Sequence, residues 1–98
     1  MEESRIEKRL KKQIELIGGK AFKFVSPGVS GMPDRIVLMP GGRIYFVELK
    51  APGKKLKALQ KYRAKELKNL GFDVRTIDTM EKVDSFTEEV KSNAIHTA

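Results

Sequence analysis

One stretch near the middle of this 98-residue chain, residues 43–50 with the sequence RIYFVELK, limits the possible folds most strongly. It is rich in the β-branched and aromatic residues that strands prefer. Its five apolar side chains alternate between the two faces of an extended strand: Ile44 and Phe46 on one, Tyr45, Val47 and Leu49 on the other. A strand that is apolar on both faces is a central strand of a sheet covered on both sides. The chain is therefore expected to adopt an α/β fold, with helices flanking a sheet.

The end of this strand carries two charged residues, Glu48 and Lys50. They project together, because residues two apart on a strand share a face. A second candidate strand, residues 35–39, begins directly after Pro33-Asp34, and the Pro40-Gly41-Gly42 segment between the two strands is typical of a tight hairpin. This hairpin is expected to bring Asp34 back beside Glu48.

Two adjacent carboxylates and a neighbouring strand carbonyl form a hard oxygen site of the kind that suits Mg²⁺ or Mn²⁺. Such a metal lowers the pKa of a bound water and neutralises the charge that develops during phosphodiester cleavage. Lys50 would then orient the nucleophile, stabilise developing charge or act as a general base, and the sequence leaves these three roles open. Taken separately, Pro33-Asp34 is a common turn and Glu48 with Lys50 a common charge-paired strand face. Taken together, they favour a metal-dependent nuclease.

Several segments resemble the PD-(D/E)XK nuclease superfamily, and more narrowly its VRR-NUC branch, which occurs alone in small phage and bacterial proteins and is related to Holliday junction resolvases. The matching segments are Gly31-Met32-Pro33-Asp34, Phe46-Val47-Glu48-Leu49-Lys50, Ala51-Pro52-Gly53 and Gln60. The resemblance runs from about residue 7 to about residue 77. It implies a restriction-endonuclease-like core of order αβββαβ, with a mixed sheet flanked by helices and, here, a short C-terminal helix.

The resemblance also implies roles for individual residues. Asp34 and Glu48 would bind the metal with help from the Leu49 carbonyl, Lys50 would be catalytic, and Gln60 would be a further residue of the catalytic motif, facing the sheet near Lys50. By spacing alone, Gln60 is equally a polar residue at the edge of an amphipathic helix.

The resemblance further implies that an acidic residue on the first helix reaches the site as a metal ligand, and Glu7 matches that position. However, Ser4-Arg5-Ile6-Glu7 has the pattern of a capping box, in which Glu7 would instead bond to the backbone amide of Ser4.

The charge of the chain is unevenly distributed. The net charge is +7, and residues 50–68 contain eight basic residues and one acid. A basic stretch beside the proposed site is suited to a polyphosphate substrate and predicts salt-sensitive binding. Five residues are the candidate nucleic-acid contacts: Ser30, in the glycine-containing loop 26–31, and Lys54, Lys55, Lys57 and Lys61. The alternatives are a solvated helix face for the lysines and an ordinary connection for the loop.

Hydrophobic periodicity and turn residues predict a single domain, 1–98, with its core at about 4–78 and a frayed tail at 93–98. The expected elements, in order, are a helix over 4–17, strands over 20–25, 35–39 and 43–50, a helix over 56–70, a strand over 72–77, and a short final helix marked by Val83, Phe86 and Val90. In the helix over 56–70, the leucines are expected to point inward: Leu56, Leu59, Leu67 and Leu70. A right-handed crossover would make the last strand parallel to residues 43–50.

The leading functional hypothesis is an endonuclease that hydrolyses DNA with Mg²⁺ or Mn²⁺, with branched DNA such as four-way junctions as substrate. We expect a homodimer sharing the apolar stripes of its first and final helices, and no small-molecule cofactor. The alternatives are a noncatalytic basic nucleic-acid-binding module, and a nuclease acting on RNA or single strands. The chain has no cysteine for disulfides or thiolate metal sites, no apolar run of membrane length and no signal-peptide core, which indicates a cytoplasmic protein.

Overall fold

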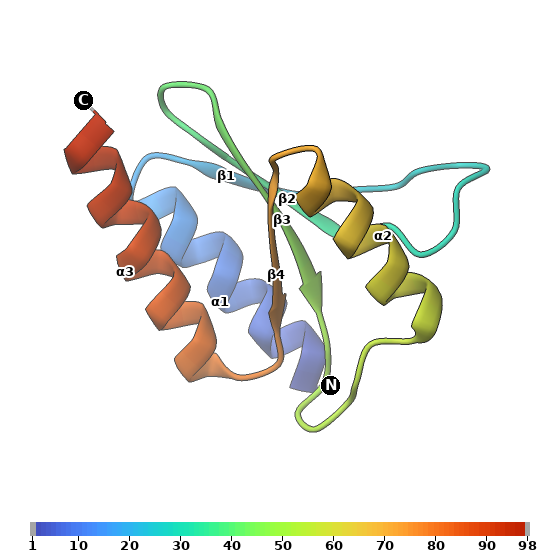
Figure 1. The fold of residues 1–98 in the computed structure, drawn as a ribbon. Coiled ribbons are helices and arrows are strands. Elements are labelled where there is room, and N and C mark those ends of the chain that lie inside the picture. The colour runs from blue at the N-terminus through green and yellow to red at the C-terminus, as the bar shows by residue number, and fades with distance from the viewer. Residues whose placement is uncertain (1, 98) are drawn as a thin grey trace.

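The computed structural model describes residues 2–97, with side chains described over 2–93. Three helices and four strands follow one another along the chain (Figure 1): α1 (Glu2–Leu16), β1 (Lys20–Lys23), β2 (Arg35–Met39), β3 (Arg43–Leu49), α2 (Ala58–Asn69), β4 (Asp73–Ile77) and α3 (Met80–Thr97). The strands form one sheet in the order β1-β2-β3-β4. Strand β2 pairs antiparallel with both β1 and β3, whereas β3 pairs parallel with β4, as the crossover through α2 predicted.

The central position of β3 is confirmed, because it lies between β2 and β4. Helices α1 and α3 lie side by side against one face of the sheet, and α2 covers part of the opposite face (Figure 1). The main core forms under α1 and α3: Ile6, Leu10, Ile14, Val37, Met39, Tyr45, Val47, Leu49, Ile77, Val83, Phe86 and Val90. A smaller cluster of Phe46, Leu67 and Val74 lies under α2. The apolar stripes of α1 and α3 are thus buried within the chain, so they are not the shared surface expected for a dimer.

The register of the β2–β3 hairpin brings the two ends of the motif together. Arg35 pairs with Val47, and the preceding residue, Asp34, therefore lies opposite Glu48. The turn between the strands uses Gly41 and Gly42, whose φ angles of 86° and 78° favour glycine. The expected position of Asp34 beside Glu48 is confirmed.

Three expected boundaries were wrong. Helix α1 begins at Glu2, so Ser4 lies inside the helix and the capping box does not form. The final helix is 18 residues long instead of short, and it ends at Thr97. Helix α2 begins at Ala58 and buries only Leu67 of the four expected leucines, since Leu59 and Leu70 are exposed and Leu56 precedes the helix.

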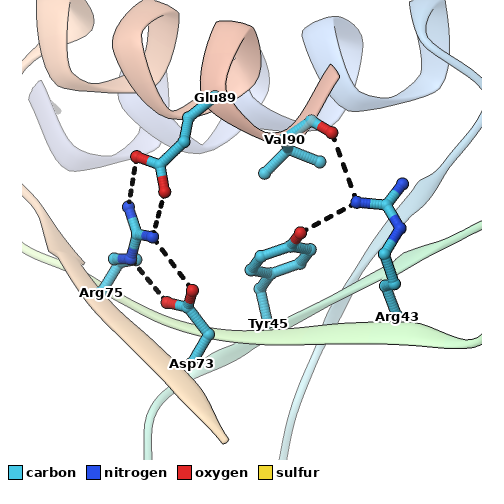
Figure 2. Close-up of polar contacts among 6 residues, drawn as sticks. All are labelled: Arg43, Tyr45, Asp73, Arg75, Glu89 and Val90. Carbon is cyan, nitrogen blue, oxygen red and sulfur yellow. Dashed lines mark hydrogen bonds and ion pairs between the residues drawn. The ribbon is translucent and has the colours of Figure 1, made fainter. Parts of the chain in front are cut away.

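Polar contacts join α3 to the sheet on the face opposite the one that α2 covers (Figure 2). Arg75 on β4 forms bidentate ion pairs with both Asp73 and Glu89. Arg43 Nη1 donates hydrogen bonds to the Tyr45 hydroxyl at 2.9 Å and to the Val90 carbonyl at 3.3 Å. This face of the sheet is therefore occupied by structural contacts. None of the helices in residues 2–97 has the length and apolar character needed to cross a membrane.

Candidate functional site

Asp34 is the first residue of the candidate site, and the ends of two strands fix its position. Its Oδ1 accepts a hydrogen bond from the Leu49 amide at 3.0 Å. Its main-chain carbonyl accepts from the Phe24 amide at 2.9 Å and from Arg35 Nη1 at 2.8 Å. One oxygen of the carboxylate is therefore held against the last residue of β3. The second oxygen, Oδ2, lies 3.5 Å from Arg35 Nη1.

Glu48 is the second carboxylate, and it is only 7% exposed. It lies on the face of β3 that α2 covers, and Gln60 Nε2 donates to its Oε2 at 3.2 Å. Lys50 Nζ lies 3.7 Å from the same oxygen. Lys50 itself directly follows β3, where its amide donates to the Ile77 carbonyl at 3.0 Å. The four residues expected to be catalytic, Asp34, Glu48, Lys50 and Gln60, are thus brought together.

The surroundings of Asp34 and Glu48 disfavour the ionised form of both carboxylates. Burial, and then repulsion from Asp34, raise the pKa of Glu48 from 4.5 to about 7, although Lys50 acts in the opposite direction. Burial also raises the pKa of Asp34, against the hydrogen bond from the Leu49 amide, and the charge of Glu3 raises it further. Two partly desolvated carboxylates facing each other are the arrangement that a divalent cation stabilises.

The Leu49 carbonyl fits a role as a third ligand. In an antiparallel strand the N–H and C=O of one residue point the same way, so this carbonyl lies on the side where the Leu49 amide meets Asp34. Continuing the β2–β3 register places Pro33 opposite Leu49, and proline has no N–H to donate to that carbonyl. Within the described residues, no three acidic, histidine or cysteine side chains are placed to hold a metal. Two carboxylates and one carbonyl therefore fit a hard cation that keeps water in its other positions.

Arg35 is a site residue that the sequence reasoning missed. It is 8% exposed, and its guanidinium pairs with Glu7 of α1 and lies 3.5 Å from Asp34 Oδ2. Glu7 is therefore joined to the site through Arg35, and the structure does not bring its carboxylate together with Asp34 and Glu48. The signal was present in the sequence, because Arg35 shares a strand face with Val37 and Met39, which are core residues, and a cation at such a position requires a partner.

Helix α2 connects this centre to the basic surface. Gln60 Oε1 accepts a hydrogen bond from the Lys57 amide at 2.8 Å, so one side chain caps the helix and contacts Glu48. The expected nucleic-acid contacts, Ser30, Lys54, Lys55, Lys57 and Lys61, are all exposed. The Ser30 carbonyl accepts from Arg63 Nε at 3.0 Å, a contact with α2 that sequence reasoning did not anticipate.

Comparison with known proteins gives consistent matches. The family model described as the VRR-NUC domain matches residues 2–81. The chain is 47% identical over 79 residues to "Putative nuclease p44" of Acyrthosiphon pisum secondary endosymbiont phage 1, covering 81% of this chain and 85% of that protein. A solved structure described as a VRR_NUC domain superposes with a TM-score of 0.85 at 31% identity, covering 90% of this chain and 96% of the other.

Proposed function

The chain belongs to the VRR-NUC domain family, and we propose that it is an endonuclease that hydrolyses DNA phosphodiester bonds with Mg²⁺ or Mn²⁺. The observation that carries the proposal is the pair of opposed carboxylates, the buried Glu48 and the half-buried Asp34, at the edge of a strongly basic surface. The similarity to a phage protein named as a nuclease supports the same reaction. The family membership and the pair of carboxylates both support phosphodiester hydrolysis.

In this proposal a small number of residues hold the metal, orient its ligands and stabilise charge on the phosphate. Asp34, Glu48 and the Leu49 carbonyl would hold the cation, which supplies an activated water and neutralises charge on the phosphate when bound. Gln60 orients Glu48 through its hydrogen bond to Oε2. Lys50 places a cation beside the same oxygen, where it would hold the attacking water or the developing negative charge on phosphate. Arg35 holds Asp34 in position through its main-chain carbonyl.

The exposed lysines supply the nucleic-acid-binding surface in this proposal. Lys54 and Lys55 lie in the loop that leads from Lys50 to α2, and Lys57 and Lys61 lie at the start of that helix. These four side chains are exposed in the segment that leads from Lys50 into the part of α2 that carries Gln60, so they are suited to contact phosphates on either side of the one being cut. The charge favours DNA or RNA equally. The preference for branched DNA rests on the family's relation to junction resolvases.

A noncatalytic binding module is the competing function. Its lysines would bind nucleic acid equally well, but it gains nothing from two carboxylates placed where phosphate approaches. The pKa of Glu48 is raised by burial and by Asp34, which means that its ionised form is energetically unfavourable here. A purely structural role does not require this unfavourable placement of a carboxylate. This observation favours the enzyme.

A homodimer is also part of the proposal, because cutting both strands of a branched DNA is simplest with two copies. The apolar surface that remains exposed on the α2 side of the sheet is a candidate interface. Leu38 and Ile44 lie opposite each other on β2 and β3, and Phe72 lies just before β4, with its ring 5.6 Å from Phe46. A surface of this kind can pair with itself about a twofold axis.

Cleavage of an end-labelled four-way junction, with matched linear duplex, flap, single strand and RNA, tests the proposed activity. The reactions contain Mg²⁺, Mn²⁺ or EDTA at low salt, and Asp34→Ala is compared with the wild type. Metal-dependent cuts that disappear in Asp34→Ala are expected, with the junction cut fastest. Tight binding without cutting in every lane, the same for both proteins, would instead establish the binding module.

A further inference from the structure

The loop between β1 and β2, residues 24–33, exposes an apolar surface next to the candidate site. It extends outward beyond α2 (Figure 1). Val25 is 69% exposed and Val29 is 42% exposed, and Pro27 between them is also exposed. Three apolar side chains within five residues, all directed at solvent, contrast with the lysines of segment 54–57, which precedes α2. We call Val25, Pro27 and Val29 the apolar tip.

The apolar tip is held in a defined conformation. The Val29 amide donates to the Ser26 carbonyl at 3.2 Å across a turn with Pro27 and Gly28 at its centre, and Gly28 has a φ angle of 81°. Proline followed by a glycine of positive φ is typical of a type II turn. Farther along the loop, Gly31 packs so closely on α2 that a Cβ there would lie 2.7 Å from Leu59 Cγ. The tip is therefore presented by a fixed turn on a fixed base.

The base of the loop is part of the candidate site. The Phe24 amide bonds to the carbonyl of Asp34, so the two ends of the loop close directly on the proposed metal ligand. Its outer half contacts α2 through Gly31 with Leu59 and through Ser30 with Arg63. Gln60, the contact of Glu48, lies on the same turns of α2. A nucleic acid bound at the carboxylates would therefore extend past this loop.

We propose that the apolar tip packs against nucleobases that are exposed where base stacking is interrupted, and that it thereby selects nucleic acid with a branch or a break over continuous duplex. This proposal rests on the nuclease function proposed above. A continuous duplex presents charged phosphates and sugars at its surface, which attract lysine and offer little to valine. Apolar side chains gain from contact with nucleic acid mainly where they wedge against unstacked bases. The lysine segment would thus bind backbone, and the apolar tip would recognise the interruption.

The test uses a four-way junction with 2-aminopurine beside the branch point, and a linear duplex with 2-aminopurine in the same sequence context. Binding and fluorescence are measured without divalent cations, so that the DNA stays intact, and cutting is measured separately with Mg²⁺ and with Mn²⁺. The variant carries Val25→Ser and Val29→Ser, which remove the apolar surface without adding charge. The control is Leu16→Ser, because Leu16 is equally exposed, at 70%, but lies at the end of α1.

The wild type and Leu16→Ser are expected to raise 2-aminopurine fluorescence on the junction and not on the duplex. The double variant should lose that rise and bind the junction about tenfold more weakly, with duplex affinity changed by less than about twofold. Because both valines are exposed, its circular dichroism melting curve should match that of the wild type.

Three results would separate the failure of this proposal from the failure of the nuclease function. A wild type that cuts DNA but gives no fluorescence rise, or a double variant that equals the wild type on both substrates, overturns the role of the tip and leaves the nuclease intact. A wild type that cuts no nucleic acid with either metal overturns the proposed function, and the role of the tip with it.

Discussion

At the scale of single residues, the most informative group is Glu48. Its pKa in the folded chain is raised to about 7 by burial and by Asp34, above its ordinary 4.5. The folded state therefore binds more protons than the unfolded state between these two values, and the free energy of unfolding falls as pH rises through this window. Asp34, whose pKa is also raised, contributes in the same direction.

We expect metal-free protein to lose stability between about pH 4.5 and pH 7, and Glu48→Gln to remove most of that loss, about 3 kcal/mol at pH 8. The glutamine keeps the shape of the side chain and removes its charge. Urea unfolding of both proteins at a series of pH values in EDTA measures the difference. A Glu48→Gln variant with the same pH dependence as the wild type would show that this carboxylate is not under electrostatic strain.

Divalent cations should change the stability of the protein over the same pH range. Because a cation at the carboxylates competes with protons, Mn²⁺ is expected to raise the melting temperature more at pH 8 than at pH 5. Differential scanning calorimetry with and without Mn²⁺ measures this, and Asp34→Ala serves as the control that should respond at neither pH. An equal response at both pH values in the wild type would place the bound ion elsewhere.

Arg35 supports a prediction about stability. Removing its charge leaves Glu7 without its partner and Asp34 with one hydrogen bond fewer. We expect Arg35→Met to cost about 2 kcal/mol, less than for a fully buried pair because the Glu7 side chain is 45% exposed. In a double-mutant cycle with Glu7→Gln, the two losses should be clearly less than additive. Strict additivity would mean that the ion pair contributes nothing.

At the scale of secondary-structure elements, α2 links stability and activity through one side chain. Gln60 accepts a hydrogen bond from the Lys57 amide at the start of the helix and donates one to Glu48. Two substitutions separate these functions. Gln60→Glu keeps an oxygen for the amide but faces Glu48 with a second negative charge, whereas Gln60→Ala removes both contacts.

Gln60→Ala is expected to destabilise the protein by about 1 kcal/mol through loss of the cap, and Gln60→Glu by less in the presence of metal. Both should slow cutting by about tenfold to a hundredfold, because the orientation of Glu48 depends on the amide nitrogen. Thermal melting and single-turnover cleavage measure the two effects. Unchanged cleavage in both variants would make Gln60 a helix cap and nothing more.

Sequence patterns predicted these elements well where periodicity was strong and poorly where it stopped. The alternation in residues 43–50 correctly placed β3 at the centre of the sheet. The final helix was expected to be short from the three apolar positions Val83, Phe86 and Val90, yet no proline or glycine interrupts residues 80–97 and the helix continues. The inward positions of Leu59 and Leu70 were wrong, because α2 covers only part of its sheet face and spacing alone does not reveal the extent of that cover.

The site shows the same limit. Asp34, Glu48 and Lys50 were recognisable because strand geometry alone sets their relation. Contacts made across the fold were not recognisable in this way. The pairing of Glu7 with Arg35, and of Ser30 with Arg63, depends on how α1 and α2 dock on the sheet, which local sequence patterns do not specify.

At the scale of the whole molecule, the net charge of +7 matters less than its position. We expect the logarithm of DNA affinity to fall linearly with the logarithm of salt concentration. Lys54→Gln, Lys55→Gln, Lys57→Gln and Lys61→Gln should each reduce the slope by up to about 0.9 if the side chain contacts a phosphate. Lys91→Gln, on the exposed side of α3, should leave it unchanged. Fluorescence anisotropy over a salt series measures these slopes, and equal effects of all five substitutions would mean that the protein binds DNA without a defined surface.

The β2–β3 hairpin offers an attachment point for single-molecule experiments on this protein. Its turn, Pro40-Gly41-Gly42, is exposed, and nothing lies within 4 Å of a Cβ built on either glycine. The turn lies at the opposite end of these two strands from Asp34 and Glu48. A short peptide tag inserted between Gly41 and Gly42 would anchor single molecules to a surface by this end and leave the carboxylates facing the DNA.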